Sequence, residues 1–149
     1  MKRKGCISDY IEARNADIMR AFHEQIDAVS FINLPDIFAA VSESPSVRFW
    51  VSEERAAVVI SLLFAGRKLP PMRPCKREMF MEIFRRAKIL RGQDPTLTAV
   101  QMAITIVHQP APCFYLTPRS VQEIYYKIKR GFYDEFRDRC NLKRKSQKD

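Results

Sequence analysis

Polar side chains near the C-terminal end of the chain recur at helical spacing and have types that can hold or read nucleic acid. The candidate contact residues are Arg119, Gln122, Tyr126, Lys127, Lys129 and Arg130. Arg119, Gln122, Tyr126 and Lys129 are three or four residues apart, which places them along one side of a helix. Arginine can pair with guanine and glutamine with adenine, while lysine or tyrosine can hold phosphate. An ordinary solvated helix is the alternative interpretation.

A second basic group lies between residues 67 and 91, where nine Lys and Arg accompany only two Glu. Within it, Arg85, Arg86 and Lys88 are candidates for phosphate contacts. Residues 1–66 carry a net charge of −2, whereas the rest of the chain carries +11. A positive excess confined to one part of a chain favours a polyanionic partner.

Metal and catalytic chemistry find little support in the residue spacing. The four cysteines lie far apart with no CxxC pair, and the only histidines are His23 and His108. Zinc ligands usually come as two close pairs, so no metal site and no cofactor are expected, and the thiols are interpreted as reduced. No local pattern pairs a nucleophile with a base, and His108 at a helix end is favoured by the helix dipole alone. We therefore expect that the protein is not an enzyme.

The elements that would position these residues repeat along the chain. A shift of 65 residues aligns Pro45, Phe49 and Gly66 with Pro110, Phe114 and Gly131. Chance similarity is the alternative to duplication, but the helix signals repeat as well.

The clearest repeated element is the last helix of each copy. Ser52 is predicted to cap a helix over 53–65, and Thr117 a helix over 118–130 that begins with Pro118. A glycine follows each helix and can end it in a left-handed conformation.

Two further helices are predicted before each of these. In the first copy they cover about 10–28 and a segment starting near Asn33. In the second copy they cover about 76–90 and a segment starting at Asp94, with Leu97, Val100, Ile104 and Val107 as its apolar stripe. The connector 66–75 contains three prolines and is predicted to be non-helical.

The fold class that follows is all-α, with two tandem related three-helix units. Residues 1–66 form the first unit, 67–131 the second, and 132–149 a helical extension with a basic tail. The aromatic segments VRFWVS and PCFYLT precede the third helices. They predict either a short strand pairing or extended loops that bury Phe49 and Phe114.

The two capped helices differ on their outer faces. Apolar residues of the first, including Val58, Leu62 and Phe64, align with Glu123, Lys127 and Lys129 of the second. The first helix therefore has a second apolar face that must be covered, by the other unit, a protein partner or a second copy.

The order of helices, with an N-capped and exposed third helix, resembles the tri-helical helix-turn-helix DNA-binding group. The phrases ESPSVRFWVSEERA and HQPAPCFYLTPRS resemble those of small uncharacterised proteins carried by bacterial mobile elements. The connection from about His108 to Thr117 is longer than the usual turn of the helix-turn-helix motif, which favours phosphate contact over base reading.

Composition is consistent with a nucleic-acid-binding protein and excludes several other classes. The 149 residues include only four glycines and no glycine-rich phosphate motif, which disfavours a nucleotide-binding fold. No apolar run is long enough to suggest secretion or membrane insertion, so a cytoplasmic location is expected. The predicted function is binding of nucleic acid through the second unit, with double-stranded DNA favoured over RNA. The alternative is a protein-interaction adaptor using Val58, Leu62 and Phe64.

Overall fold

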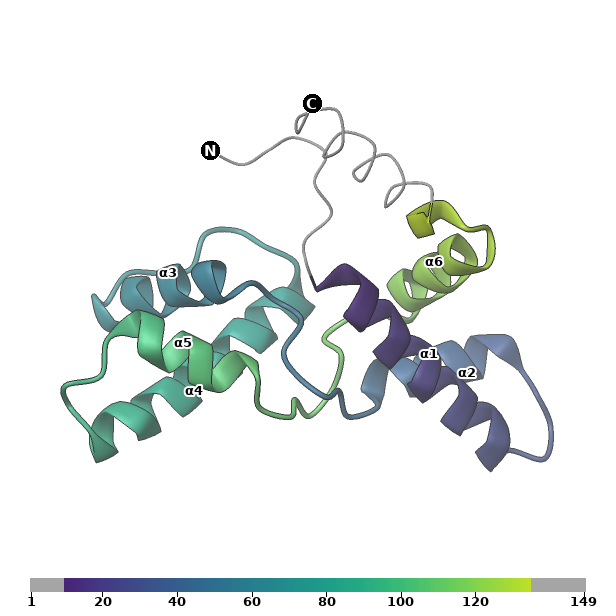
Figure 1. Cartoon of the computed structure of the whole chain (residues 1–149), viewed down its shortest axis with the longest axis horizontal. Coiled ribbons are helices and arrows are strands. Elements are labelled where there is room, and N and C mark those ends of the chain that lie inside the picture. The colour runs from purple at the N-terminus through teal and green to yellow at the C-terminus, as the bar shows by residue number, and fades with distance from the viewer. Residues whose placement is uncertain (1–9, 135–149) are drawn as a thin grey trace, which may run out of the picture.

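The computed structural model describes residues 10–134, and this part of the chain is helical with no strand. Its helices are α1 (Ile11–Ala28), α2 (Leu34–Glu43), α3 (Glu53–Phe64), α4 (Pro74–Gln93), α5 (Ala99–Val107) and α6 (Pro118–Lys129) (Figure 1). Helical backbone resumes at 132–134, and the rest of the predicted extension and tail lies outside the described residues. The all-α prediction is confirmed.

Both third helices begin and end where the sequence indicates. Ser52 accepts a hydrogen bond from the Arg55 amide at 3.1 Å, and Thr117 accepts one from the Ser120 amide at 3.1 Å. Gly66 and Gly131 have φ values of 76° and 73°. These glycines adopt a backbone conformation that other residues rarely adopt, so both helix stops are confirmed.

Replacing Thr117 by alanine is expected to lower the free energy of unfolding by about 0.5–2 kcal/mol. The substitution removes the side-chain acceptor of a first-turn amide, while the hydroxyl contacts no other helix in the described structure. Urea titration of the variant beside Thr117→Ser, which keeps the acceptor, measures the effect. A loss below a few tenths of a kcal/mol would contradict the importance of this cap.

The N-cap of α5 lies four residues later than predicted. Asp94 does not cap this helix; it ends α4, and its carboxylate accepts hydrogen bonds from Thr96. Thr98 is the N-cap and forms a complete capping box with Gln101, which satisfies two backbone amides reciprocally. The buried face shifts accordingly to Met102, Ala103, Ile106 and Val107, while Val100 and Ile104 are exposed.

The helices form two bundles that exchange their third helices. α6 packs against α1 and α2, whereas α3 packs against α4 and α5 (Figure 1). The helix that ends each half of the sequence therefore completes the core of the other half. The predicted boundary near residue 66 divides the chain into halves, but it does not separate the two packed bodies.

Each bundle has its own hydrophobic core. In the α1–α2–α6 bundle the buried residues include Ile18, Phe22, Phe38, Val41, Phe114, Val121 and Ile124. In the α3–α4–α5 bundle they include Phe49, Val59, Ile60, Phe80, Ile83, Met102 and Ile106. Phe49 and Phe114 are thus buried anchors, one in each core.

The chain passes between the bundles through two extended segments that cross. Ser46 and Ala111 exchange backbone hydrogen bonds of 3.0 Å in an isolated antiparallel bridge, and these two residues are 65 positions apart. The bridge lies just upstream of VRFWVS and PCFYLT, and those segments form no further strand pairing. The expected strand pairing is therefore reduced to this one bridge.

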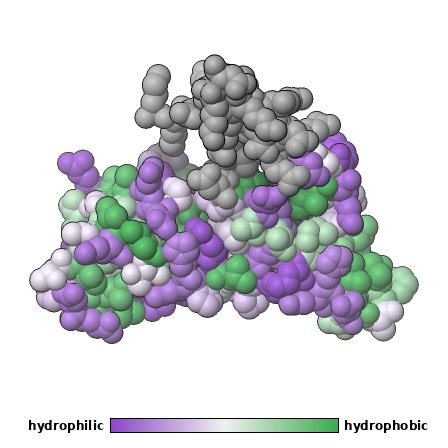
Figure 2. Space-filling view, in the orientation of Figure 1, coloured by the Kyte–Doolittle hydropathy of each residue, from purple (hydrophilic) through white to green (hydrophobic). Residues whose placement is uncertain are grey.

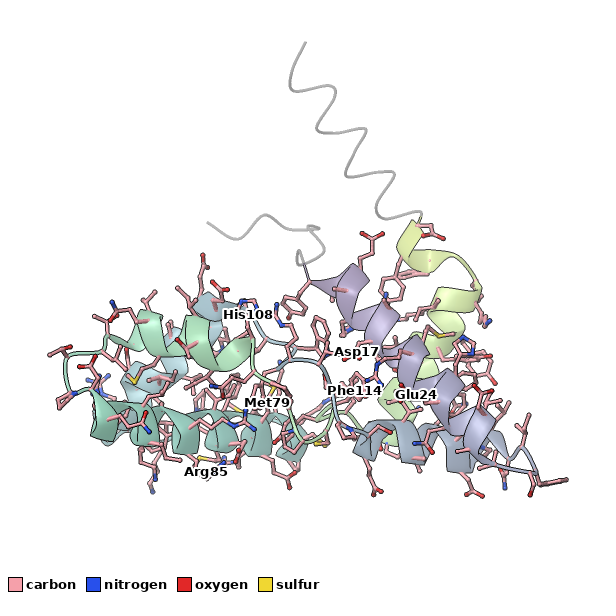
Figure 3. The ribbon with its side chains drawn as sticks, turned by 60° about the horizontal axis from the view of Figure 1, so that its bottom comes forward. Asp17, Glu24, Met79, Arg85, His108 and Phe114 are labelled. Atoms are coloured by element: carbon pink, nitrogen blue, oxygen red, sulfur yellow. The ribbon has the colours of Figure 1, made fainter. Side chains whose placement is uncertain are left out.

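A buried carboxylate holds the first crossing segment. Oδ2 of Asp17 accepts hydrogen bonds from the Ser46 hydroxyl (2.9 Å), the Val47 amide (3.1 Å) and the Trp50 indole (3.1 Å). Its Oδ1 pairs with Arg20 at 2.8 Å, and the side chain is only 2% exposed. Figure 3 shows Asp17 and Phe114 close to the place where the segments cross. Asp17 thus links α1 to the segment that leads out of its bundle.

The second apolar face of α3 is covered largely from within the chain. Leu62 and Phe64 are half-buried. The ring of Phe64 contacts the Phe84 ring of α4 edge-on, and the Arg91 guanidinium lies over the Phe64 ring. Val58 stays exposed. The two apolar faces of α3 are explained by its position against both α4 and α5.

Candidate nucleic-acid interface

The predicted contact residues are divided between the two bundles. Arg85, Arg86 and Lys88 lie on α4, whereas the other six predicted residues lie on α6 or directly after it. The exchange of third helices places α6 against α1 and α2 instead of α4. In Figure 3 the labelled Arg85 points away from the bundle that contains α6. The structure therefore does not unite these residues in one three-helix unit.

The outer face of α6 is presented to solvent. Arg119, Gln122, Tyr126, Lys129 and Arg130 are exposed, while Lys127 is half-buried. Arg119 lies 3.5 Å from Glu123, and the Lys129 ammonium lies over the Tyr125 ring. These side chains remain available to a ligand, with Lys127 the least accessible.

The surroundings of α6 are acidic. Residues 10–45, which include α1 and α2, contain six Asp and Glu but only two Lys and Arg. Residues 51–113, which include α3, α4 and α5, contain ten Lys and Arg against five Asp and Glu. The exchange therefore leaves the positive excess on the α3–α4–α5 bundle, and α6 lies beside negative charge.

Arg86 makes contacts inside the protein that leave little for phosphate. Its guanidinium donates to Glu82 at 3.0 Å, to the Gln109 side chain at 3.1 Å and to the Pro110 carbonyl at 3.0 Å. It also lies over the Phe49 ring. Arg86 thus joins α4 to both crossing segments, and the structure gives it a structural role that its sequence context did not indicate.

Arg85 is exposed and forms an ion pair with Glu82 at 2.7 Å. Hydrogen bonds from Arg85, and then from Arg86, lower the pKa of Glu82 to about 2. Glu82 is therefore ionised at neutral pH and neutralises part of the local charge. Lys88 is exposed, with its ammonium over the Phe84 ring.

Five basic residues that precede Arg85 in the sequence were not among the predicted contact residues. This basic strip consists of Arg67, Lys68, Arg73, Lys76 and Arg77. All five are exposed, and none forms an ion pair within residues 10–134. The nine Lys and Arg between residues 67 and 91 were the sequence feature that could have identified these five residues.

Three residues of the strip, Arg73, Lys76 and Arg77, lie at the N-terminal end of α4, where the helix dipole is already positive, whereas Arg67 and Lys68 lie in the connector just after α3. The first turn of α4 contains no acidic residue and includes Lys76, and Arg73 is the N-cap residue. Cations at a helix N-terminus are electrostatically unfavourable, whereas an anion there is stabilised by the exposed amides. These cations therefore do not stabilise the helix, but they would attract an anion to its N-terminal end.

The described residues include no group of three or more His, Cys, Asp or Glu able to hold a metal ion. His108 contacts Glu53 at 2.6 Å and so joins α5 to the start of α3, and both side chains are partly exposed. Within residues 10–134, no helix is both long and apolar enough to span a membrane.

No protein-family model matches the chain, and comparisons with curated proteins and with solved structures gave no match.

Proposed function

We propose that the protein binds nucleic acid through the basic strip of residues 67–77, with double-stranded DNA as the expected ligand. The observation that carries this proposal is the set of five exposed cations without ion-pair partners in the described chain. Arg85 and Lys88 extend the same basic surface along α4. A polymer of phosphates fits such a surface because each added contact releases counterions and adds to the affinity.

Duplication of a three-helix unit explains the architecture. Equivalent positions 65 residues apart have the same structural role: Ser52 and Thr117 are helix caps, and Asp17–Arg20 and Glu82–Arg85 are ion pairs. Ser46 and Ala111, also 65 residues apart, form the bridge with each other. The carbonyls of Pro45 and Pro110 both accept a hydrogen bond from an arginine of the first helix of their own half.

In this scheme the α1–α2–α6 bundle is the unit that resembles the helix-turn-helix group, with α6 as its exposed third helix. Arg119 and Gln122 are the candidates for reading bases from that helix, and Lys129 and Arg130 for contacting phosphate. The acidic residues of α1 and α2 weaken this face as a phosphate site, which is why the proposal rests on the strip.

The strip predicts a specific salt dependence. Replacing all five of its cations by glutamine is expected to flatten the slope of log affinity against log salt by up to about 4.5, at about 0.9 per lost phosphate contact. Binding to a fluorescent duplex, titrated at several salt concentrations, measures the slope. Single-stranded DNA and RNA of the same sequence show which nucleic acid is preferred.

The matched control replaces Arg119, Lys127, Lys129 and Arg130 of the α6 region by glutamine, which removes a similar charge from the other bundle. The control is expected to change the slope much less. A larger loss in the control than in the strip variant would move the site to α6. Binding no stronger than a basic surface without an evolved ligand, about 10⁻⁴ M at physiological salt, would contradict the function itself.

A further inference from the structure

The connection between α1 and α2 exposes apolar side chains at the far end of its bundle. This apolar tip consists of Val29, Phe31, Ile32 and Leu34. Phe31 is 83% exposed, and Figure 2 shows hydrophobic surface at this end of the molecule. A large aromatic side chain in water, among three other apolar residues, marks a contact surface.

The equivalent connection in the other bundle is polar. Between α4 and α5, Asp94, Thr96 and Thr98 occupy the positions 65 residues after Val29, Phe31 and Asn33, and they bond to each other or to the backbone. The same turn of the chain can therefore be built without exposed apolar groups. The apolar tip is not a requirement of the fold.

The charge beside the tip is negative. Asp27 lies in the last turn of α1 and Asp36 in the first turn of α2, and both are exposed. The last turn of α1 contains no basic residue, so the negative end of its dipole adds to Asp27. Nucleic acid and anionic membranes would be repelled here, whereas an apolar surface with basic residues around it would fit.

The outer face of α4 has these properties. Met81 and Ile89 are exposed on it, and Arg85 and Lys88 lie between them in the sequence and on the same side of the helix. Glu82 lies on this side too and pairs with Arg85, whereas Lys88 has no ion pair within residues 10–134. The other exposed apolar group of this bundle is Val58 on α3 with Val100 and Ile104 on α5. Glu54 and Arg55 both lie one turn before Val58, so this group has no excess of positive charge beside it.

The two surfaces lie on different bundles, the tip at one end of the molecule and the α4 face along the other bundle (Figure 3). In Figure 3 the connection between α1 and α2 and the labelled Arg85 both lie along the lower edge. A two-fold axis across the long direction would therefore bring the tip of each copy to α4 of the other. Such a contact is made twice and closes on itself, so it gives a dimer and not a fibre.

We propose that two copies of this chain associate by docking the apolar tip of each on the α4 face of the other. The contact uses Arg85 and Lys88, which also extend the basic surface along α4, but none of the basic strip that carries the nucleic-acid proposal. Phe31 belongs to the apolar tip alone, so its replacement tests the dimer without removing a basic residue, and the two proposals fail separately.

Sedimentation velocity of the full chain over a range of concentrations tests the dimer. Phe31→Ser is expected to raise the dissociation constant about 100-fold, since a loss of about tenfold at one contact occurs twice. Val100→Ser, on the α3–α5 surface, is the matched control and is expected to change nothing. Circular dichroism shows whether each variant is folded.

Charge reversal identifies the partner surface. Asp27→Lys with Asp36→Lys, and separately Arg85→Glu with Lys88→Glu, are each expected to weaken the dimer. All four reversals in one chain are expected to restore it, which a loss of folding could not do. A wild-type protein that stays monomeric up to about 1 mM would overturn the proposal, as would a four-fold variant that is no better than either pair.

Discussion

The two halves of the chain, residues 1–66 and 67–149, are each expected to remain unfolded alone and to fold when mixed. The first half contains α1 and α2 without α6, so Phe22 and Phe38 lose the Tyr125 ring that they contact. It also contains α3 without α4 and α5, the helices against which α3 packs. A domain of about 60 residues buries only about 60% of the surface of its unfolded chain even with a complete core, and here each half lacks most of its core partners.

Circular dichroism of each half, and of an equimolar mixture, measures this dependence. The helical signal of the mixture is expected to exceed the sum of the halves and to melt cooperatively. The control is the full chain cleaved after Lys68, in the connector 67–73 between the halves. Leu69 and Met72 of the connector pack against the α3–α4–α5 core and stay attached to α4 after this cut, so the cleaved chain should stay folded. Cooperative unfolding of residues 1–66 alone would contradict the exchange of third helices.

Removing the Asp17 carboxylate is expected to lower the free energy of unfolding by at least about 3 kcal/mol, because three donors lose their shared acceptor at about 1–3 kcal/mol each. In Asp17→Ala, the Ser46 hydroxyl, the Val47 amide and the Trp50 indole lose their shared acceptor. Arg20 keeps Glu24 and the Pro45 carbonyl, so its charge is not left alone. The loss therefore falls mainly on the crossing segment.

Glu82, which occupies the equivalent position in the second half, is the matched comparison. Its side chain is 21% exposed, and its partner Arg85 is more exposed still. Solvent replaces part of what is lost there, so Glu82→Ala is expected to cost about 1 kcal/mol. Chemical denaturation of both variants gives the two values. A cost for Asp17→Ala no greater than that for Glu82→Ala would show that the buried network does not hold the crossing.

Local signals in the sequence were enough to predict the helices. A cap such as Ser52 or Thr117 and a following glycine act within a few residues, so the ends of α3 and α6 agree with prediction to within one residue. The error at α5 is also local, because the capping box of Thr98 and Gln101 satisfies more backbone groups than Asp94 could. The polar residues along one side of α6 were also enough to predict that this side is exposed to solvent.

The partner of each third helix depended on the tertiary structure. An apolar stripe such as Val121 and Ile124 indicates that one face of a helix is buried. It does not indicate whether that face packs against α1 and α2 or against α4 and α5, because both pairs have apolar residues to cover it. The crossing is decided by contacts between distant residues, including the bridge of Ser46 with Ala111 and the bonds of Asp17 and Arg86. The same contacts determined that Arg86 is structural and that α6 lies apart from the basic residues of α4. Sequence by itself thus determined where helices form, because capping and periodicity are short-range, whereas the exchange required long-range packing that only the folded chain provides.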